Sequence, residues 1–290
     1  MKMINWPESL ILDLARRRCI LFLGAGVSMN SVSATGIRPP SWKSFLEKCI
    51  ADLQSCQQIK KLITNEDYLT ACELIKKKLP RGQFDTIVQT QFLTPAYTAA
   101  DIHKNLFRLD CRIVITPNFD KIYETYVNTE THGTVTIKNY YDDDIVSSIK
   151  NNGRVILKIH GTVDNTRNLI FSRSDYAKAR SKSRDFYELL NALGLTHTFL
   201  FIGCGVNDPD IKLLLEDSFF KHNATKPHYM IAANSSIHKD MIPVIEETLN
   251  LNLIQYKSTR GNHDILTQSL NELSALVETK RLEIKETMNW

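Results

Sequence analysis

Seven short β-rich runs alternate with segments of helical character along most of this chain. The runs lie at residues 19–24, 111–116, 134–138, 154–159, 198–203, 228–232 and 251–256. Several are apolar throughout, as is typical of strands buried on both faces of a sheet. Helices are expected between most of the runs, at 120–127, 142–150, 183–195, 209–221 and 237–249, and a last one at 263–280. The alternation predicts an α/β fold with a doubly wound, mostly parallel, Rossmann-like sheet.

One long interval breaks this alternation, because residues 25–110 contain helical patterns and no convincing strand. Ser41 is a good N-cap for a first helix, and further helices are expected at 66–79, 81–92 and 98–109. We interpret residues from about 40 to 109 as a helical module inserted after the first strand. Such a module would wall one side of a cleft at the strand ends, where doubly wound folds bind ligands. The chain is then one domain over 1–280 with a tail at 281–290.

Composition excludes several classes of protein. Apolar residues make up 43% and charged residues 23% of the 290 residues, which excludes a disordered chain. A net charge of +4 is too weak to indicate direct nucleic-acid binding. Pro7, Glu8 and Asp13 interrupt the N-terminal apolar stretch, and the longest apolar run, about 20–27, is too short to cross a membrane. We therefore expect a cytoplasmic protein that has no membrane contact.

The cysteine pattern bears on metal binding. The six cysteines are Cys19, Cys49, Cys56, Cys72, Cys111 and Cys204. No two of them form a C-x-x-C pair, so the sequence predicts neither a zinc module nor a disulfide framework. Scattered free thiols are also typical of a reducing compartment.

The first candidate site follows the first run, where residues 24–28 read GAGVS. Glycines there allow a tight turn and a close approach to a pyrophosphate. The motif fails as a dehydrogenase fingerprint, because Met29 occupies the position of the third glycine. It indicates either a nucleotide site or a tight strand-to-helix turn with no ligand.

Three more unusual segments follow predicted strands. They read TPNFD at 116–120, KIHG at 158–161 and IGCGVNDPD at 202–210. Asn118 and His160 are candidate functional side chains, although a lone histidine is more often structural. Asp120 could equally be a helix N-cap, and the last segment makes a good helix start. Because the carboxyl ends of parallel strands meet at one edge, we expect all these motifs in one site.

The four motifs in this order resemble the bacterial sirtuin-like (Sir2-like) NADase family of antiphage defence systems. The resemblance extends over about residues 17–275 and includes the segment 170–176 after the histidine. It implies catalytic roles for Asn118 and His160, with His160 as a general base near the nicotinamide ribose. It also implies an NAD site that is formed by the remaining motif residues, Gly24, Ala25, Gly26, Ser28, Asp120, Gly203 and Cys204.

The resemblance further implies an activity. Protein-deacylating sirtuins carry a four-cysteine zinc module for which this chain has no cysteine pairs, so metal-independent hydrolysis of NAD+ to nicotinamide and ADP-ribose is favoured. Within the family, such a subunit is controlled by homo-oligomerisation or by a hexameric HerA-like ATPase, and nucleic-acid contact is expected to belong to that partner. Two alternatives remain: an NAD-dependent ADP-ribosyltransferase or deacylase, and a catalytically idle nucleotide-sensing subunit of a DNA-processing ATPase complex.

Overall fold

An all-parallel sheet forms the centre of the molecule in the computed structural model, which describes residues 3–206, 208–212, 214–215, 226–258 and 262–289. Its strands are β1 (Cys19–Leu23), β2 (Ile113–Thr116), β3 (Thr136–Asn139), β4 (Val155–Lys158), β5 (Thr198–Ile202), β6 (His228–Ala233) and β7 (Leu251–Tyr256). They are ordered β3-β4-β2-β1-β5-β6-β7. Every predicted run forms a strand, and the predicted α/β, Rossmann-like fold is confirmed.

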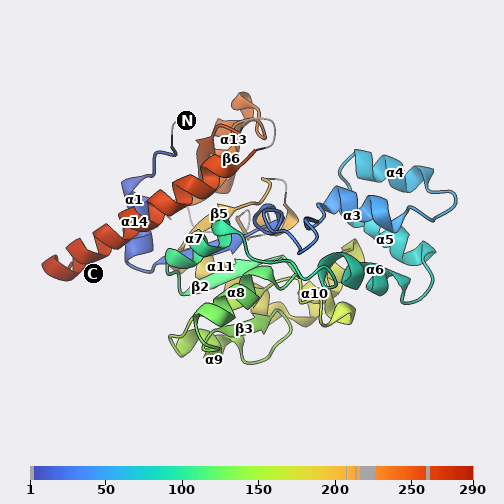
Figure 1. The fold of residues 1–290 in the computed structure, drawn as a ribbon, viewed down its shortest axis with the longest axis horizontal. Helices are drawn as coiled ribbons and strands as arrows, with labels where there is room; N and C mark the ends of the chain where they lie inside the picture. The colour runs from blue at the N-terminus through green and yellow to red at the C-terminus, as the bar shows by residue number, and fades with distance from the viewer. Residues whose placement is uncertain (1–2, 207, 213, 216–225, 259–261, 290) are drawn as a thin grey trace.

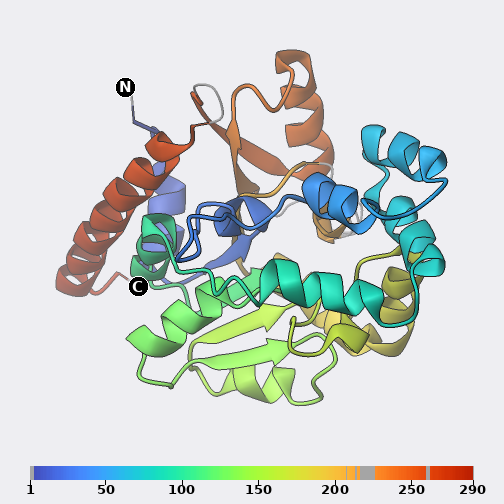
Figure 2. The same ribbon diagram turned by 45° about the vertical axis from the view of Figure 1, so that its right-hand side comes forward.

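Helices cover both faces of the sheet (Figures 1 and 2). One face packs against α1 (Glu8–Ala15), α7 (Asp101–Arg108), α8 (Ile122–Glu130) and α14 (Asp264–Thr287). The other face packs against α9 (Ile145–Lys150), α11 (Arg184–Thr196) and α13 (Ile242–Leu249). Successive strand residues enter opposite cores: Leu21 lies in the first and Phe22 in the second. This burial on both faces explains why the strands read as continuous apolar runs.

A helical module with its own core projects from the sheet. It consists of α3 (Trp42–Cys49), α4 (Gln57–Thr64), α5 (Tyr68–Lys78) and α6 (Gln83–Phe92). The module lies at the opposite end of the molecule from α1 and α14 (Figures 1 and 2). Its core joins Phe45 of α3 to Phe171, which follows β4 in the chain. Ser41 caps α3 as predicted, since its side chain accepts a hydrogen bond from the backbone N–H of Ser44.

Several helices differ from the sequence prediction. Helix α7, which we assigned to the inserted module, instead packs against α14 and α8 in the layer on the sheet. Helices α4 and α10 (Arg173–Lys182) were not expected, nor were the short α2 (Ala25–Ser28) and the 3-10 turns η1 (Thr166–Asn168) and η2 (Lys239–Met241). The expected helix at 209–221 lies partly outside the described residues; 209–212 and 214–215 are helical.

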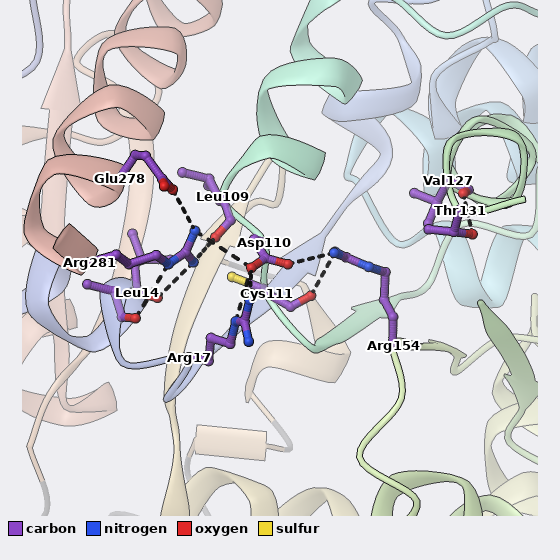
Figure 3. Close-up of polar contacts among 11 residues, drawn as sticks. Leu14, Arg17, Leu109, Asp110, Cys111, Val127, Thr131, Arg154, Glu278 and Arg281 are labelled. Atoms are coloured by element: carbon purple, nitrogen blue, oxygen red, sulfur yellow. Dashed lines mark hydrogen bonds and ion pairs between the residues drawn. The ribbon is translucent and has the colours of Figure 1, made fainter. Parts of the chain in front are cut away.

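The last helix extends beyond its predicted end, into the segment that we expected to be a tail. Helix α14 continues to Thr287, because Ile284 is buried in the core of the first face. Arg281 adds polar contacts, donating to the backbone oxygen of Leu109 at 2.8 Å and pairing with Asp110 (Figure 3). Arg17 and Arg154 also pair with Asp110, at the edge of the sheet where the strands begin. This cluster links α14 to the N-terminal ends of the central strands.

None of the helices in the described part of the chain combines the length and the apolar character needed to cross a bilayer.

Two glycine-containing turns meet at the centre of the sheet edge where the strands end. The order of the strands reverses between β1 and β5, where doubly wound sheets open a crevice. There the N–H of Gly26 donates to the backbone oxygen of Gly203 at 2.9 Å. A Cβ atom on Gly24 would lie 2.5 Å from that same oxygen, and Gly203 has a φ of +70°. The glycines are therefore required by backbone contact between the two turns.

We predict that Gly24→Ala destabilises the protein by more than about 2 kcal/mol, because the added methyl group would collide with the backbone of Gly203 as well as with Cys204 Sγ. Gly153→Ala is the matched control, since a Cβ at that position has no atom within 4 Å. Thermal unfolding of the two variants beside the parent protein measures the effect. Equal melting temperatures for all three proteins would contradict the steric argument.

Candidate active site

A cavity of about 610 Å³ lies at the carboxyl ends of β1, β2, β4 and β5. Its volume falls within the range of small-molecule and cofactor sites. The helical module forms its other wall, which includes Trp42 and Phe45 of α3, Tyr68 of α5 and Phe92 of α6. The module thus takes the place beside the strand ends that the sequence suggested.

Most of the predicted site residues border this cavity. Those that line it are Ala25, Ser28, Asn118, Asp120, His160, Gly203 and Cys204. Gly24 and Gly26 are not among the lining residues, but both pack closely against Gly203, which does line the cavity. Motifs far apart in the sequence therefore meet around one space.

The side chain of Asn118 is held in one orientation. Its Nδ2 donates to the backbone oxygen of Gly24 at 2.9 Å and to Ser28 Oγ at 3.0 Å. Because a backbone carbonyl can only accept, the amide nitrogen must face Gly24. No hydrogen bond from the described residues reaches Oδ1 of Asn118. That oxygen remains as the acceptor that Asn118 can offer to a ligand in the cavity.

Asp120 combines two roles that the sequence left open. Its Oδ1 accepts from the backbone N–H of Ile122, the first residue of α8, at 3.0 Å, although Lys121 rather than Asp120 occupies the N-cap position. Its Oδ2 accepts from Ser28 Oγ at 2.7 Å, which ties the turn after β1 to the turn after β2. The buried carboxylate therefore holds Ser28 in place beside Asn118.

His160 follows β4 and is buried in a cluster of polar side chains. Its Nε2 lies 2.7 Å from Asp210 Oδ2 and 2.9 Å from the hydroxyl of Tyr176. The Tyr176 hydroxyl donates to Asp210 Oδ2 at 3.0 Å. Since that hydroxyl proton is directed to Asp210, Nε2 of His160 carries a proton. In the neutral ring the lone pair is then on Nδ1.

Buried charge controls the protonation of this cluster. Burial lowers the pKa of His160, but the Asp210 carboxylate outweighs it and holds that pKa above the usual value. Burial and the nearby Asp210 charge raise the pKa of the Asp208 carboxyl to about 7. Burial also raises the pKa of Tyr176 well above its usual value, so the phenol stays protonated. The cluster can therefore take up or release a proton near neutral pH.

The roles of Tyr176, Asp208 and Asp210 were missed by sequence reasoning. The two aspartates were read only as part of a helix start, and Tyr176 lies on α10, a helix that was not expected. The sequence signal that could have revealed α10, and with it Tyr176, is the capping box of Ser172 and Asp175 at the start of that helix.

Helix α10 is attached to the module as well as to the site. Arg173 pairs with Asp67 at 2.9 Å, and Lys76 of α5 pairs with Asp175 at 2.8 Å. The helix that brings Tyr176 to His160 is thus fixed to the helix whose N-terminal end lines the cavity.

The aromatic wall was also missed. The Phe119 ring lies 4.6 Å between centroids from both Phe92, edge to face, and Phe171, tilted, and Phe171 contacts Trp42 edge to face at 5.6 Å. These rings come from four separate segments, so no local sequence pattern could place them together. They give one side of the cavity an apolar, aromatic surface that a planar ring could contact.

Among the described residues there is no group of three or more histidine, cysteine, aspartate or glutamate side chains placed to hold a metal ion.

Residues 112–254 match the family model of the SIR2-like domain. The NAD(+) hydrolase ThsA of Enterococcus faecium is 26% identical over 215 residues, covering 73% of this chain and 42% of that protein. The NAD(+) hydrolase ThsA of Bacillus cereus (strain MSX-D12) is 24% identical over 222 residues, covering 74% and 44%. Defense-associated sirtuin 2 of Bacillus subtilis is 23% identical over 270 residues, covering 91% and 26%. The chain spans less than half the length of each relative.

We predict that Asp210→Asn lowers the pKa of His160. The asparagine keeps the shape and can still accept from Tyr176, but it removes the carboxylate that contributes most to raising this pKa, leaving the weaker effect of Asp208 against that of burial. An NMR titration of the histidine ring signals measures the pKa of His160. The His160 signal is assigned as the one that is missing in the His160→Gln variant. Asp240→Asn removes an exposed carboxylate beside His238 and should leave the His160 titration unchanged. An unchanged or higher pKa in Asp210→Asn would refute the stated cause.

Proposed function

We propose that this chain is an NAD+ hydrolase of the bacterial sirtuin-like family that acts in antiphage defence. The observation that carries the proposal is the cavity at the strand ends, where Asn118 and the cluster of His160, Tyr176 and Asp210 face a wall of aromatic rings. The match of residues 112–254 to the SIR2-like domain and the similarity to proteins named NAD(+) hydrolase support it.

The cavity offers distinct surfaces to the parts of NAD+. The aromatic wall suits the planar rings, and the turns after β1 and β5, with Ala25, Ser28, Gly203 and Cys204, are proposed to hold the phosphates, the riboses and the adenosine side. Gly24 and Gly26 contribute by letting these turns approach each other. Asn118 and Asp120 then face the nicotinamide pocket.

The proposed reaction breaks the bond between the nicotinamide nitrogen and C1′ of the ribose. Both electrons of that bond leave with the nitrogen, which neutralises the nicotinamide, and the ribose carbon gains positive charge. Water adds to C1′, giving ADP-ribose and releasing one proton. Asn118 Oδ1 orients the water or a ribose hydroxyl and places partial negative charge near the developing cation. His160 accepts the proton, and Asp210 stabilises the resulting imidazolium. No step in this sequence requires a metal.

The protonation state of His160 sets the sign of the pH dependence. A base must be neutral to accept a proton, and the pKa of His160 is raised above its usual value. Hydrolysis is therefore expected to decline as the pH falls through that raised pKa. The Asp210→Asn variant lowers the pKa, so its acid limb should lie at a lower pH.

We predict that Asn118→Ala and His160→Ala each reduce kcat for NAD+ hydrolysis at least ~100-fold, the usual scale for losing a positioned electrostatic group or a positioned acid–base group. Release of nicotinamide and ADP-ribose measures turnover, and circular dichroism checks the fold. Asn128→Ala and His238→Ala are matched controls, because both residues are exposed and neither lines the cavity. Near-parental turnover in either site variant would remove that residue from the mechanism.

The same assay separates the alternatives. Label from NAD+ that appears on protein would indicate an ADP-ribosyltransferase, and removal of an acyl group would indicate a deacylase. Binding of NAD+ with no turnover, by a folded protein under every condition tried, would indicate an idle nucleotide sensor.

We further propose that the hydrolase is cytoplasmic and is controlled by assembly, as a homo-oligomer or with a hexameric HerA-like ATPase. Uncontrolled loss of NAD+ would harm the host, so activity must depend on a second event. The test is to co-express the chain with the product of a neighbouring ATPase gene. We expect the two to co-purify and the rate of NAD+ loss to differ at least several-fold from that of the chain alone. Separate elution and equal rates would contradict this arrangement.

A further inference from the structure

A buried ion pair lies directly beneath the proposed site. Lys158 is the last residue of β4, and its Nζ contacts a carboxylate oxygen of Glu124 on α8. The side chains are only 1% and 8% exposed, and neither residue borders the 610 Å³ cavity. Lysine ends an otherwise apolar strand here, and the proposed mechanism gives it no part in the reaction.

Stability alone does not account for this pair. Burying two charges costs free energy that their attraction repays only partly, so an apolar pair of similar volume often serves stability equally well or better. The cost is visible at Glu124, where burial raises the pKa although Lys158 acts in the opposite direction. The residues that the ion pair contacts therefore indicate whether it has a second role.

The pair is the base of a continuous series of contacts that ends at Asn118. Lys158 Nζ donates to the backbone oxygen of Asp120 at 2.5 Å. The carboxylate of Asp120 accepts from Ser28 Oγ, and Ser28 Oγ accepts from Nδ2 of Asn118. All five side chains border one small void of about 10 Å³, so they converge on the same point.

We propose that Lys158 and Glu124 are positioning residues for the hydrolysis. By holding the backbone of Asp120, the pair fixes Ser28 and with it the amide of Asn118, so that Oδ1 of Asn118 stays directed to the cavity. Glu124 holds the Lys158 ammonium in place and neutralises it. This inference rests on the proposed function, because the group that is positioned is the one assigned to the reacting centre.

The test uses the double variant Lys158→Met/Glu124→Met, which removes both charges and roughly preserves volume. We expect it to fold with a melting temperature within a few degrees of the parent, because no longer burying two charges offsets the loss of the hydrogen bond to the backbone oxygen of Asp120. Its KM for NAD+ should change less than about twofold, since the cavity lining is retained, and its kcat should fall at least ~10-fold. The side-chain amide NMR signal of Asn118, assigned with Asn118→Asp, should shift, and its protons should exchange faster with solvent.

A matched control comes from the other end of the same strand. Arg154 precedes β4 and pairs with Asp110 at 2.6 Å (Figure 3). Arg154→Met removes a partly buried ion pair from the strand and should leave kcat and the Asn118 signal unchanged. Glu124→Gln is the second variant: it keeps the shape and weakens the hold on Lys158, so we expect a fall of about threefold or more in kcat. If the double variant does not fold, Glu124→Gln alone tests the positioning role of the pair.

The outcomes are distinguishable. A folded double variant, or a folded Glu124→Gln, with parental kcat and an unchanged Asn118 signal overturns the positioning role. A parent protein that binds NAD+ and never hydrolyses it overturns the proposed function, and the NMR comparison still decides whether the pair orders Asn118.

Discussion

Burial of the parallel sheet on both faces is the constraint on which the rest of this structure depends. Each central strand sends alternate side chains into two separate cores, so its faces have no room for solvated polar groups. Functional side chains are then confined to the turns after the strands. Because all strands run in the same direction, those turns gather at one edge, and reversal of the strand order between β1 and β5 opens space between them.

The turns at this edge are held by backbone contact and by buried charge. Gly26 and Gly203 let two turns touch directly, which no residue with a side chain would allow at that distance. Around them Asp120 joins neighbouring turns through Ser28, and Asp210 holds His160 through its Nε2. Hydrogen bonds to ionised groups are stronger than those between neutral groups, so these contacts can keep side chains in place in a cavity that must also admit a ligand.

The helical module adds a second wall to the crevice at this edge. Its aromatic residues face the polar strand ends across the cavity, and its α5 is fixed to α10 by ion pairs such as Arg173 with Asp67. Helix α10 in turn supplies Tyr176 to His160. One wall is therefore aromatic while the other carries the polar side chains, and a single helix links the module to the histidine.

The sequence by itself determined the strands, the class of fold and the place of the site. Apolar runs buried on both faces leave a strong local signal, and GAGVS, TPNFD and KIHG follow such runs directly, so Asn118 and His160 could be singled out. The partners of these residues were decided only by the tertiary structure. Tyr176 and Asp210 reach His160 from two helical segments whose separation along the chain has no periodic pattern. The packing of α7 with the sheet and the ion pair of Lys158 with Glu124 likewise depend on which elements become neighbours, and local sequence does not encode that.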